Sequence, residues 1–280
     1  MKKILYFLAI AAMATAMTTM SSCKKDDGPE PVNENNFPVP AMAEHAVKVN
    51  ITTSDAPYTF FEATEGGRFI VGKSDGTYIT GSYTVTDNIY TLQGFGKVKV
   101  VKTKAEVSVI YLTFLPNEAA EVHVEGIPAT PVTDNDSKNL CRLWNVTKTR
   151  IALTDAVNVA AEFQGCDLNA IEEFITQYVE LKKHLPTGMN VIGVTFTSMS
   201  TYMIEYSAHP ADISSWNWNG SSHDSLKYKW KSEDMGYEWE NGSAKIEYAE
   251  NTLIFTGDVD LKNGNKNYHV NIYMAMVPKN

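Results

Sequence analysis

Apolar residues alternate with polar residues along most of the chain from about Ala46 onward, and this period of two constrains the fold more than any other feature. In the segment 268–276, Tyr-His-Val-Asn-Ile-Tyr-Met-Ala-Met, the first, third, fifth, seventh and ninth residues are apolar. Successive side chains of a β-strand point to opposite sides, so the pattern predicts antiparallel strands with one buried and one wet face. Turn signals separate these strands at Asp75-Gly76, Asp87-Asn88, Asn219-Gly220, Asn241-Gly242 and Asn263-Gly264. Short strands at this spacing indicate an all-β fold, either a β-sandwich or an up-and-down barrel.

One segment, 167–185, departs from the strand pattern. Its apolar residues recur at steps of three and four, which is the stripe of an amphipathic helix. They are Leu168, Ile171, Phe174, Ile175, Tyr178 and Val179. Asp167 is placed to cap the helix, and Pro186 with Gly188 to stop it. We expect this helix to cover an end of the sheet structure; a partner-binding helix is the alternative.

Length and composition limit the class of protein. A chain of 280 residues predicts about two domains, each large enough to bury a core. The content of 44% hydrophobic and 20% charged residues is not that of a disordered chain or a polytopic membrane protein. A formal charge of −9 argues against nucleic acid as a partner, because nucleic-acid-binding proteins carry a basic stripe.

The N-terminus predicts export and lipid attachment. Lys2 and Lys3 precede an uncharged, mostly apolar run over 4–17, which is too short to span about 30 Å of hydrocarbon and so indicates a signal peptide over 1–22. The next feature, Met20-Ser21-Ser22-Cys23, resembles a bacterial lipobox. The resemblance implies cleavage before Cys23, diacylglycerol on its thiol and acylation of its new amino group, which together anchor a protein stably in a membrane. Ordinary secretion with an incidental cysteine is the alternative.

Residues 23–40 predict a flexible tether. The segment is rich in Pro and Asn and has no apolar periodicity, so we expect it to be extended and solvated. The charged residues after Cys23 look like the export signal of Bacteroidetes surface lipoproteins. That resemblance implies an outer-membrane protein exposed at the cell surface, with the periplasmic face of that membrane as the alternative.

The two halves of the body are weakly similar in sequence. Four segments align in order: 67–71 with 200–204, 79–85 with 213–218, 89–92 with 226–230, and 96–100 with 243–248. Duplication and shared strand patterning both explain this. The turn-rich segment 130–137 is the natural boundary, which gives an N-terminal β domain over 41–130 and a C-terminal domain over 138–280.

The C-terminal domain resembles a known family. The opening Leu140-Cys141-Arg142-Leu143-Trp144-Asn145-Val146, with the later runs through Tyr202, Trp216-Asn217-Trp218 and Leu226-Lys227-Tyr228, is similar to bacterial lipocalin-like domains. The resemblance covers 138–280 and implies an eight-stranded barrel with the helix of 167–185 inserted. It also implies that Trp144 plugs one barrel end. No Gly-x-Trp motif is present, and a sandwich stays open.

Motifs for catalysis, metals and cofactors are absent from the sequence. The six histidines form no close ligand pair, and no nucleophile elbow, phosphate-binding loop or dinucleotide motif occurs. Asp134-Asn135-Asp136 lacks the Gly and distal Glu of a calcium loop. His209 and His223 flank one predicted strand, where two loop histidines or a shared metal site are both conceivable. We therefore expect no catalytic residue, metal or cofactor, and an enzyme, as a hydrolase, is the least supported alternative.

Two cysteines remain once Cys23 is acylated. Cys141 and Cys166 would lie in an oxidising compartment, where a disulfide between them is worth about 3 kcal/mol by chain entropy. Two buried free thiols are the alternative.

Aromatic residues are concentrated between Tyr202 and Trp239, many at the spacing of one strand face. They either fill the barrel or line an opening where sugars or an apolar ligand would stack. The candidate ligand-binding residues are Tyr202, Trp216, Trp218 and Trp239. The leading functional hypothesis is therefore a non-catalytic binding module for a small apolar or carbohydrate ligand. A structural protein that contacts another surface component is the alternative.

Overall fold

The chain forms two compact units in a computed structural model. It describes residues 37–102, 109–180, 185–232, 237–263 and 265–279, and for 102, 229–232, 237–242 and 259–263 it describes the backbone alone. The N-terminal unit comprises Val39–Leu143 and Thr195–Met203, with Lys279. The C-terminal unit comprises Trp144–Val194 and Ile204–Pro278, together with residues 37–38. Among the described residues no helix combines the length and the apolar character needed to cross a membrane.

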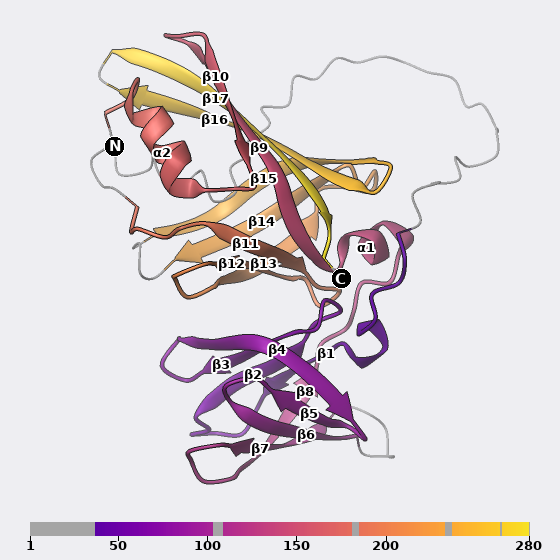
Figure 1. The fold of residues 1–280 in the computed structure, drawn as a ribbon. Coiled ribbons are helices and arrows are strands. Elements are labelled where there is room, and N and C mark those ends of the chain that lie inside the picture. The colour runs from indigo at the N-terminus through magenta and orange to yellow at the C-terminus, as the bar shows by residue number, and fades with distance from the viewer. Residues whose placement is uncertain (1–36, 103–108, 181–184, 233–236, 264, 280) are drawn as a thin grey trace, which may run out of the picture. The chain divides into compact units, whose positions relative to one another are not determined.

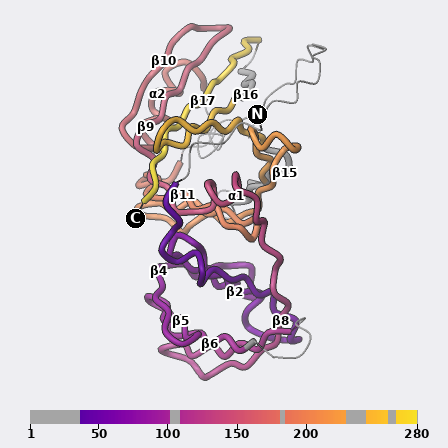
Figure 2. Tube along the Cα trace, turned by 90° about the vertical axis from the view of Figure 1, so that its right-hand side faces the viewer, coloured from indigo at the N-terminus to yellow at the C-terminus, as the bar shows by residue number. Residues whose placement is uncertain are grey.

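The first eight strands close into an antiparallel barrel, in which each strand pairs with the next and β1 pairs with β8 (Figure 1). They are β1 (Val47–Ile51), β2 (Tyr58–Ala63), β3 (Arg68–Lys73), β4 (Tyr78–Thr86), β5 (Ile89–Leu92), β6 (Gly96–Lys102), β7 (Ile110–Pro116) and β8 (Val122–Pro128). Figure 2 shows these strands closing into a ring. Inward-facing aliphatic and aromatic side chains fill the interior, among them Val49, Phe61, Phe69, Val98 and Phe114, which are completely buried.

The C-terminal strands form a second eight-stranded barrel. They are β9 (Leu143–Asp155), β10 (Val159–Gln164), β11 (Val191–Phe196), β12 (Thr201–Tyr206), β13 (Asp212–Trp218), β14 (Ser225–Ser232), β15 (Tyr237–Ala249), β16 (Thr252–Asn263) and β17 (Lys266–Pro278). Pairing of β17 with β9 closes the barrel, and β10 is an additional strand beside β9. The described part of the chain contains two α-helices, α1 (Asn135–Leu140) and α2 (Leu168–Thr176), and a short 3-10 helix, Ala43–His45, precedes β1.

The all-β prediction, with a lipocalin-like eight-stranded barrel in the second half, is confirmed, and closed barrels replace the sandwich alternative. All eight predicted strands of that half are present. Two elements were not predicted. β10 has Ala160 and Ala161 where β-branched residues would signal a strand, and α1 is a short, polar helix of six residues. α1 forms because Asp134 caps it, accepting hydrogen bonds from the backbone N–H and the hydroxyl of Ser137.

The predicted helix of 167–185 is shorter in the structure and ends at Thr176. Its start is as predicted, because the Asp167 carboxylate accepts hydrogen bonds from the backbone N–H groups of Asn169 and Ala170. After Thr176 the chain turns back along the helix, and the Glu172 carboxylate accepts the backbone N–H of Leu185. Residues 181–184, near the end of the predicted helix, lie outside the described residues.

The four aligned segments fall on equivalent strands of the two barrels. β3, β4, β5 and β6 are the third to sixth barrel strands of the first half, and β12, β13, β14 and β15 hold the same positions in the second, if β10 is set aside as the additional strand. The preceding turns also match. In the first turn the hydroxyl of Thr64 accepts the backbone N–H of Arg68, and the backbone N–H of Thr64 donates to the carbonyl of Arg68. Thr197 and Thr201 form the same two hydrogen bonds in the second turn. These matches support duplication of one barrel.

Candidate functional site

The four aromatic residues predicted as ligand contacts do not form an open site together. Tyr202 and Trp216 are each 1% exposed and are core residues. Trp218 is half-buried. It forms a T-shaped pair with Trp216 at a centroid distance of 5.5 Å, and the ring of His223 stacks on it at 4.8 Å. The side chain of Trp239 lies outside the described residues. The ring of Trp218 is therefore already engaged on a face by His223.

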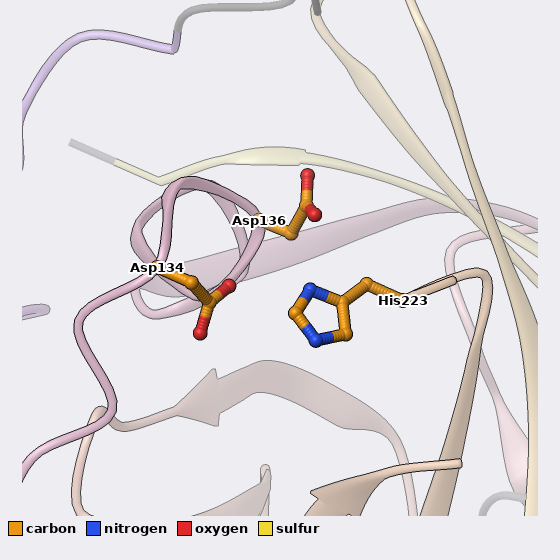
Figure 3. Close-up of side chains that lie close together, drawn as sticks. All are labelled: Asp134, Asp136 and His223. Carbon is orange, nitrogen blue, oxygen red and sulfur yellow. The ribbon is translucent and has the colours of Figure 1, made fainter. Parts of the chain in front are cut away.

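The polar groups singled out in the sequence are engaged locally. Figure 3 shows Asp134 and Asp136 at the start of α1, where Asp134 is the helix cap. His223, drawn in the same figure, belongs to the C-terminal unit. A ring nitrogen of His209 lies 3.1 Å from the carbonyl oxygen of Thr187. We assign no metal site to these residues, because Asp134 caps α1, His223 stacks on Trp218 and His209 contacts Thr187.

Cys141 and Cys166 are both free, buried thiols. Burial raises the pKa of Cys166 to about 12, and burial also raises the pKa of Cys141 well above its ordinary value. Each thiol is therefore protonated at neutral pH, and thiols in that state are poor nucleophiles.

A buried ion pair occupies the N-terminal unit. Glu62, on β2, is 0% exposed, and Lys48 Nζ lies 3.1 Å from its Oε2. The hydroxyl of Thr197 donates to Glu62 Oε1 at 2.6 Å, and that of Thr201 to Oε2 at 2.8 Å. Lys48 also donates to the Thr201 hydroxyl at 2.6 Å. Both carboxylate oxygens of Glu62 are thus paired. We therefore interpret Glu62 as a structural residue that binds the 195–203 segment, not as a reactive group.

Glu65 lies in the turn between β2 and β3, and its carboxylate has fewer partners than that of Glu62. It is 6% exposed, and its Oε1 accepts the backbone N–H of Ser198 at 3.1 Å. Its Oε2 is buried and has no hydrogen-bond partner among the residues that the structure describes. Desolvation raises the pKa of Glu65, the nearby Glu62 adds to the rise, and the hydrogen bonds from Ser198 oppose it.

A row of five residues, most of them apolar, crosses five strands of the N-terminal barrel. Tyr78 pairs with Gly72, Gly72 with Phe60, Phe60 with Asn50, and Asn50 with Ile127. Tyr78 is 45% exposed and Ile127 is 51% exposed. We call these residues the Tyr78 ledge.

Gly72 lets the two rings of the Tyr78 ledge lie along one line. A Cβ at this glycine would come 2.4 Å from Cε1 of Phe60, so the Phe60 ring covers the position where a side chain would stand. The Phe60 and Tyr78 ring centroids are 6.2 Å apart, with the rings inclined at 56°. The ledge therefore presents the exposed ring of Tyr78 beside the half-buried ring of Phe60, bordered by the exposed Asn50 and Thr59.

The charges beside the Tyr78 ledge are paired internally. Lys48, 5.0 Å above the Phe60 ring centroid, pairs with Glu62. Lys73 lies 3.3 Å from Asp75, which also accepts the backbone N–H and the hydroxyl of Thr77. These contacts lower the pKa of Asp75 to about 2, chiefly through the Thr77 hydrogen bonds. The surface around the rings is thus close to neutral.

Sequence reasoning did not predict the Tyr78 ledge. Phe60 and Phe61 are adjacent aromatic residues, so one of them must face outward if the other is in the core. That doublet, followed by an aromatic residue just after the Asp75-Gly76 turn, is the signal that the sequence offers.

Comparison with known proteins identifies no family to which the sequence conforms and no characterised protein similar to it.

Proposed function

We infer that this protein is a lipid-anchored, non-catalytic binding protein of the outer membrane, and that its ligand is an uncharged carbohydrate chain held on the Tyr78 ledge. The observation that carries the proposal is the row itself, in which the exposed ring of Tyr78 lies 6.2 Å from the half-buried ring of Phe60 on the outside of the barrel. Aromatic rings on a surface supply apolar contact area at little cost in conformational entropy.

The polar surroundings favour a sugar over a purely apolar ligand. A sugar ring has an apolar C–H face, which stacks on an aromatic ring, and a rim of hydroxyls, which needs hydrogen-bonding groups. Asn50 offers an amide donor and acceptor, and Thr59 offers a hydroxyl, both exposed at the edge of the rings. The internally paired Lys48 and Lys73 give an anionic ligand no unpaired cation to bind.

The interior of the N-terminal barrel is a poor alternative site. Sixteen buried apolar side chains form one core cluster there, and most are at most 2% exposed. An eight-stranded barrel is just wide enough for side chains to fill. A ligand would have to displace this core, whereas the ledge is accessible without any rearrangement.

Affinity electrophoresis tests the carbohydrate proposal. The mature chain, with Cys23→Ser to keep it soluble, is run in native gels that contain a neutral polysaccharide such as galactomannan or xyloglucan, and in gels that contain polygalacturonate. We expect retardation by at least one neutral polysaccharide and none by the acidic one. Tyr78→Ala should weaken the retardation by about tenfold, the effect of losing one well-placed aromatic contact.

Tyr111→Ala is the matched control, because Tyr111 is 44% exposed on a different part of the same barrel. It should leave the retardation unchanged, as should Tyr78→Phe, which keeps the ring. Equal mobility of the wild-type chain in all gels, or equal retardation of the Tyr78→Ala chain, would contradict the proposal.

The anchor and location are proposed on the lipobox resemblance at Cys23, which lies outside the described residues. Intact-mass measurement of the detergent-extracted native protein should give the mass of the chain from residue 23 plus three acyl groups and glycerol. Protease treatment of intact cells should degrade the protein if it is at the cell surface. A soluble, unacylated native protein would contradict the proposed anchor and the proposed location, but it would not affect the proposal that the Tyr78 ledge binds carbohydrate.

A further inference from the structure

The outer face of β6, β7 and β8 carries three parallel columns of different character. β6 presents Lys97 and Lys99, and β7 presents Tyr111, Thr113 and Leu115. Glu121, just before β8, and His123 and Glu125 on β8 make the third column. The register sets Lys97 beside Leu115, Lys99 beside Thr113, and Tyr111 beside Glu125. We call this the three-column face: a basic column, a central column with apolar ends, and an acidic column.

The three-column face is exposed and its lysines are unused. Tyr111 is 44% exposed, Leu115 37%, and Val101, which pairs with Tyr111, 42%. Within the part of the chain that the structure describes, neither Lys97 nor Lys99 forms an ion pair. Among the acidic residues, Glu121 has His123 as a partner at 3.1 Å, on the surface. Large apolar groups rimmed by polar and charged residues on one sheet face are typical of an interaction surface.

The order of the columns makes the face complementary to itself. Consider a second copy related by a two-fold axis that runs parallel to β7 between the two faces. The rotation sets the central column against its own copy, Tyr111 on Tyr111 and Leu115 on Leu115. It also sets the basic column of each copy against the acidic column of the other, so that Lys97 faces Glu121, and Lys99 faces His123 with Glu121 and Glu125 on either side. An isologous contact of this kind is the usual arrangement of a homodimer.

We propose that the three-column face is a homodimer interface, and that its occupant is a second copy of this chain. The three strands, each of seven residues or fewer, cover roughly 300 Å² by strand spacing and rise. That is well below the ~800 Å² per partner of a standard interface. The dimer is therefore weak and salt-sensitive in solution, because its charge pairs are exposed at the rim of the contact.

Charge exchange between the columns gives a sharp test. Sedimentation velocity of the mature chain with Cys23→Ser, from about 10 to several hundred micromolar at low salt, should show a monomer–dimer equilibrium that weakens as salt is added. Lys97→Glu with Lys99→Glu in one chain should weaken the dimer by about tenfold or more, because like charges then face each other. Glu121→Lys with Glu125→Lys in another chain should do the same.

Mixing the two charge-reversed chains in equal amounts should restore the dimer, because each reversed column then faces an opposite charge. Lys138→Glu, a reversal of an exposed lysine on α1, is the matched control and should not alter the equilibrium. A wild-type chain that stays monomeric over the whole range, or a mixture that fails to associate, would overturn the proposal. Tyr78→Ala should not change the dimer, so failure of the dimer and failure of carbohydrate binding are separable.

Discussion

Glu65 accepts the backbone N–H of Ser198 at 3.1 Å, and the two residues hold equivalent positions in two matching turns, each one residue after the threonine that ties its turn together. Within the N-terminal unit, the β2–β3 turn and the β11–β12 turn thus meet through corresponding residues. One turn supplies carboxylates and the other supplies hydroxyl and N–H donors. If one ancestral barrel was duplicated, this pairing arose by divergence at a position where both copies had the same backbone.

The buried Glu65 should make folding stability depend on pH. Because burial raises its pKa in the folded state, its contribution is fully present below the unfolded pKa of about 4.3. That contribution is lost as the pH rises through the folded pKa. Glu65→Gln keeps an acceptor for Ser198 and removes the charge. We expect the melting temperature of the substituted chain, followed by circular dichroism, to be higher than that of the wild type at pH 8. The difference between the two melting temperatures should decrease toward pH 4.5.

Other carboxylates titrate in the same range, so the comparison needs a matched acid. Glu125→Gln removes an exposed carboxylate of the same barrel and should change the melting temperature little. A gap between wild type and Glu65→Gln that does not change with pH would contradict the assignment of the proton to Glu65.

Phe37 should stabilise the C-terminal unit although it lies in the segment predicted to be a solvated tether. It is 7% exposed, and its ring contacts Trp144 edge-on at 5.4 Å and Tyr248 at 5.5 Å. Phe37→Ala should lower the free energy of unfolding of that unit by about 3 kcal/mol, the range for a buried phenylalanine. Val39→Ala, two residues on and 82% exposed, should change it by less than about 0.5 kcal/mol. Urea unfolding followed by tryptophan fluorescence measures both, and equal effects would contradict the burial of Phe37.

Much of the fold follows from the sequence because the period of two is strong where strands have one buried face. Tyr268, Val270 and Ile272 are predicted to share a face, and all are at most 2% exposed. The pattern is weaker where local contacts decide. Asp134 makes a helix of a polar segment that reads as a turn, and the return of Leu185 to Glu172 shortens α2.

The candidate site is harder to predict because it is assembled from residues that no spacing connects. Tyr78, Gly72, Phe60, Asn50 and Ile127 come from five strands, and only the pairing register places them in one row. A register irregularity between Tyr58 and Phe60 also helps to decide which of the adjacent aromatic residues faces outward. The tryptophans, in contrast, are easy to identify in the sequence. At Trp216, however, the alternation of apolar and polar residues that draws attention to the tryptophan also places its side chain in the core.

Gly72 should be required for the shape of the Tyr78 ledge. Gly72→Ala places a Cβ within 2.4 Å of the Phe60 ring and 2.7 Å of the Thr59 hydroxyl, so the ring must move. We expect a stability loss of about 1–3 kcal/mol, as for other overpacked positions, and weaker binding of the neutral polysaccharide. In a Phe60→Ala background the same substitution should cost less stability, because the clashing ring is gone. Equal costs in the two backgrounds, measured by urea unfolding, would show that Phe60 does not cover Gly72.

Cys141 and Cys166 should be unreactive in the folded protein and reactive after unfolding. Both thiols are buried, and burial raises the pKa of each, so little thiolate is available at pH 8. The mature chain with Cys23→Ser should therefore not react with Ellman's reagent when it is native. In guanidinium chloride it should react with two equivalents of the reagent. The Cys166→Ala chain should react with one equivalent of the reagent under the same denaturing conditions. No reaction after unfolding, together with a mass gain of about 2 Da on reduction, would mean that the two cysteines form a disulfide in the oxidising compartment where such bonds persist.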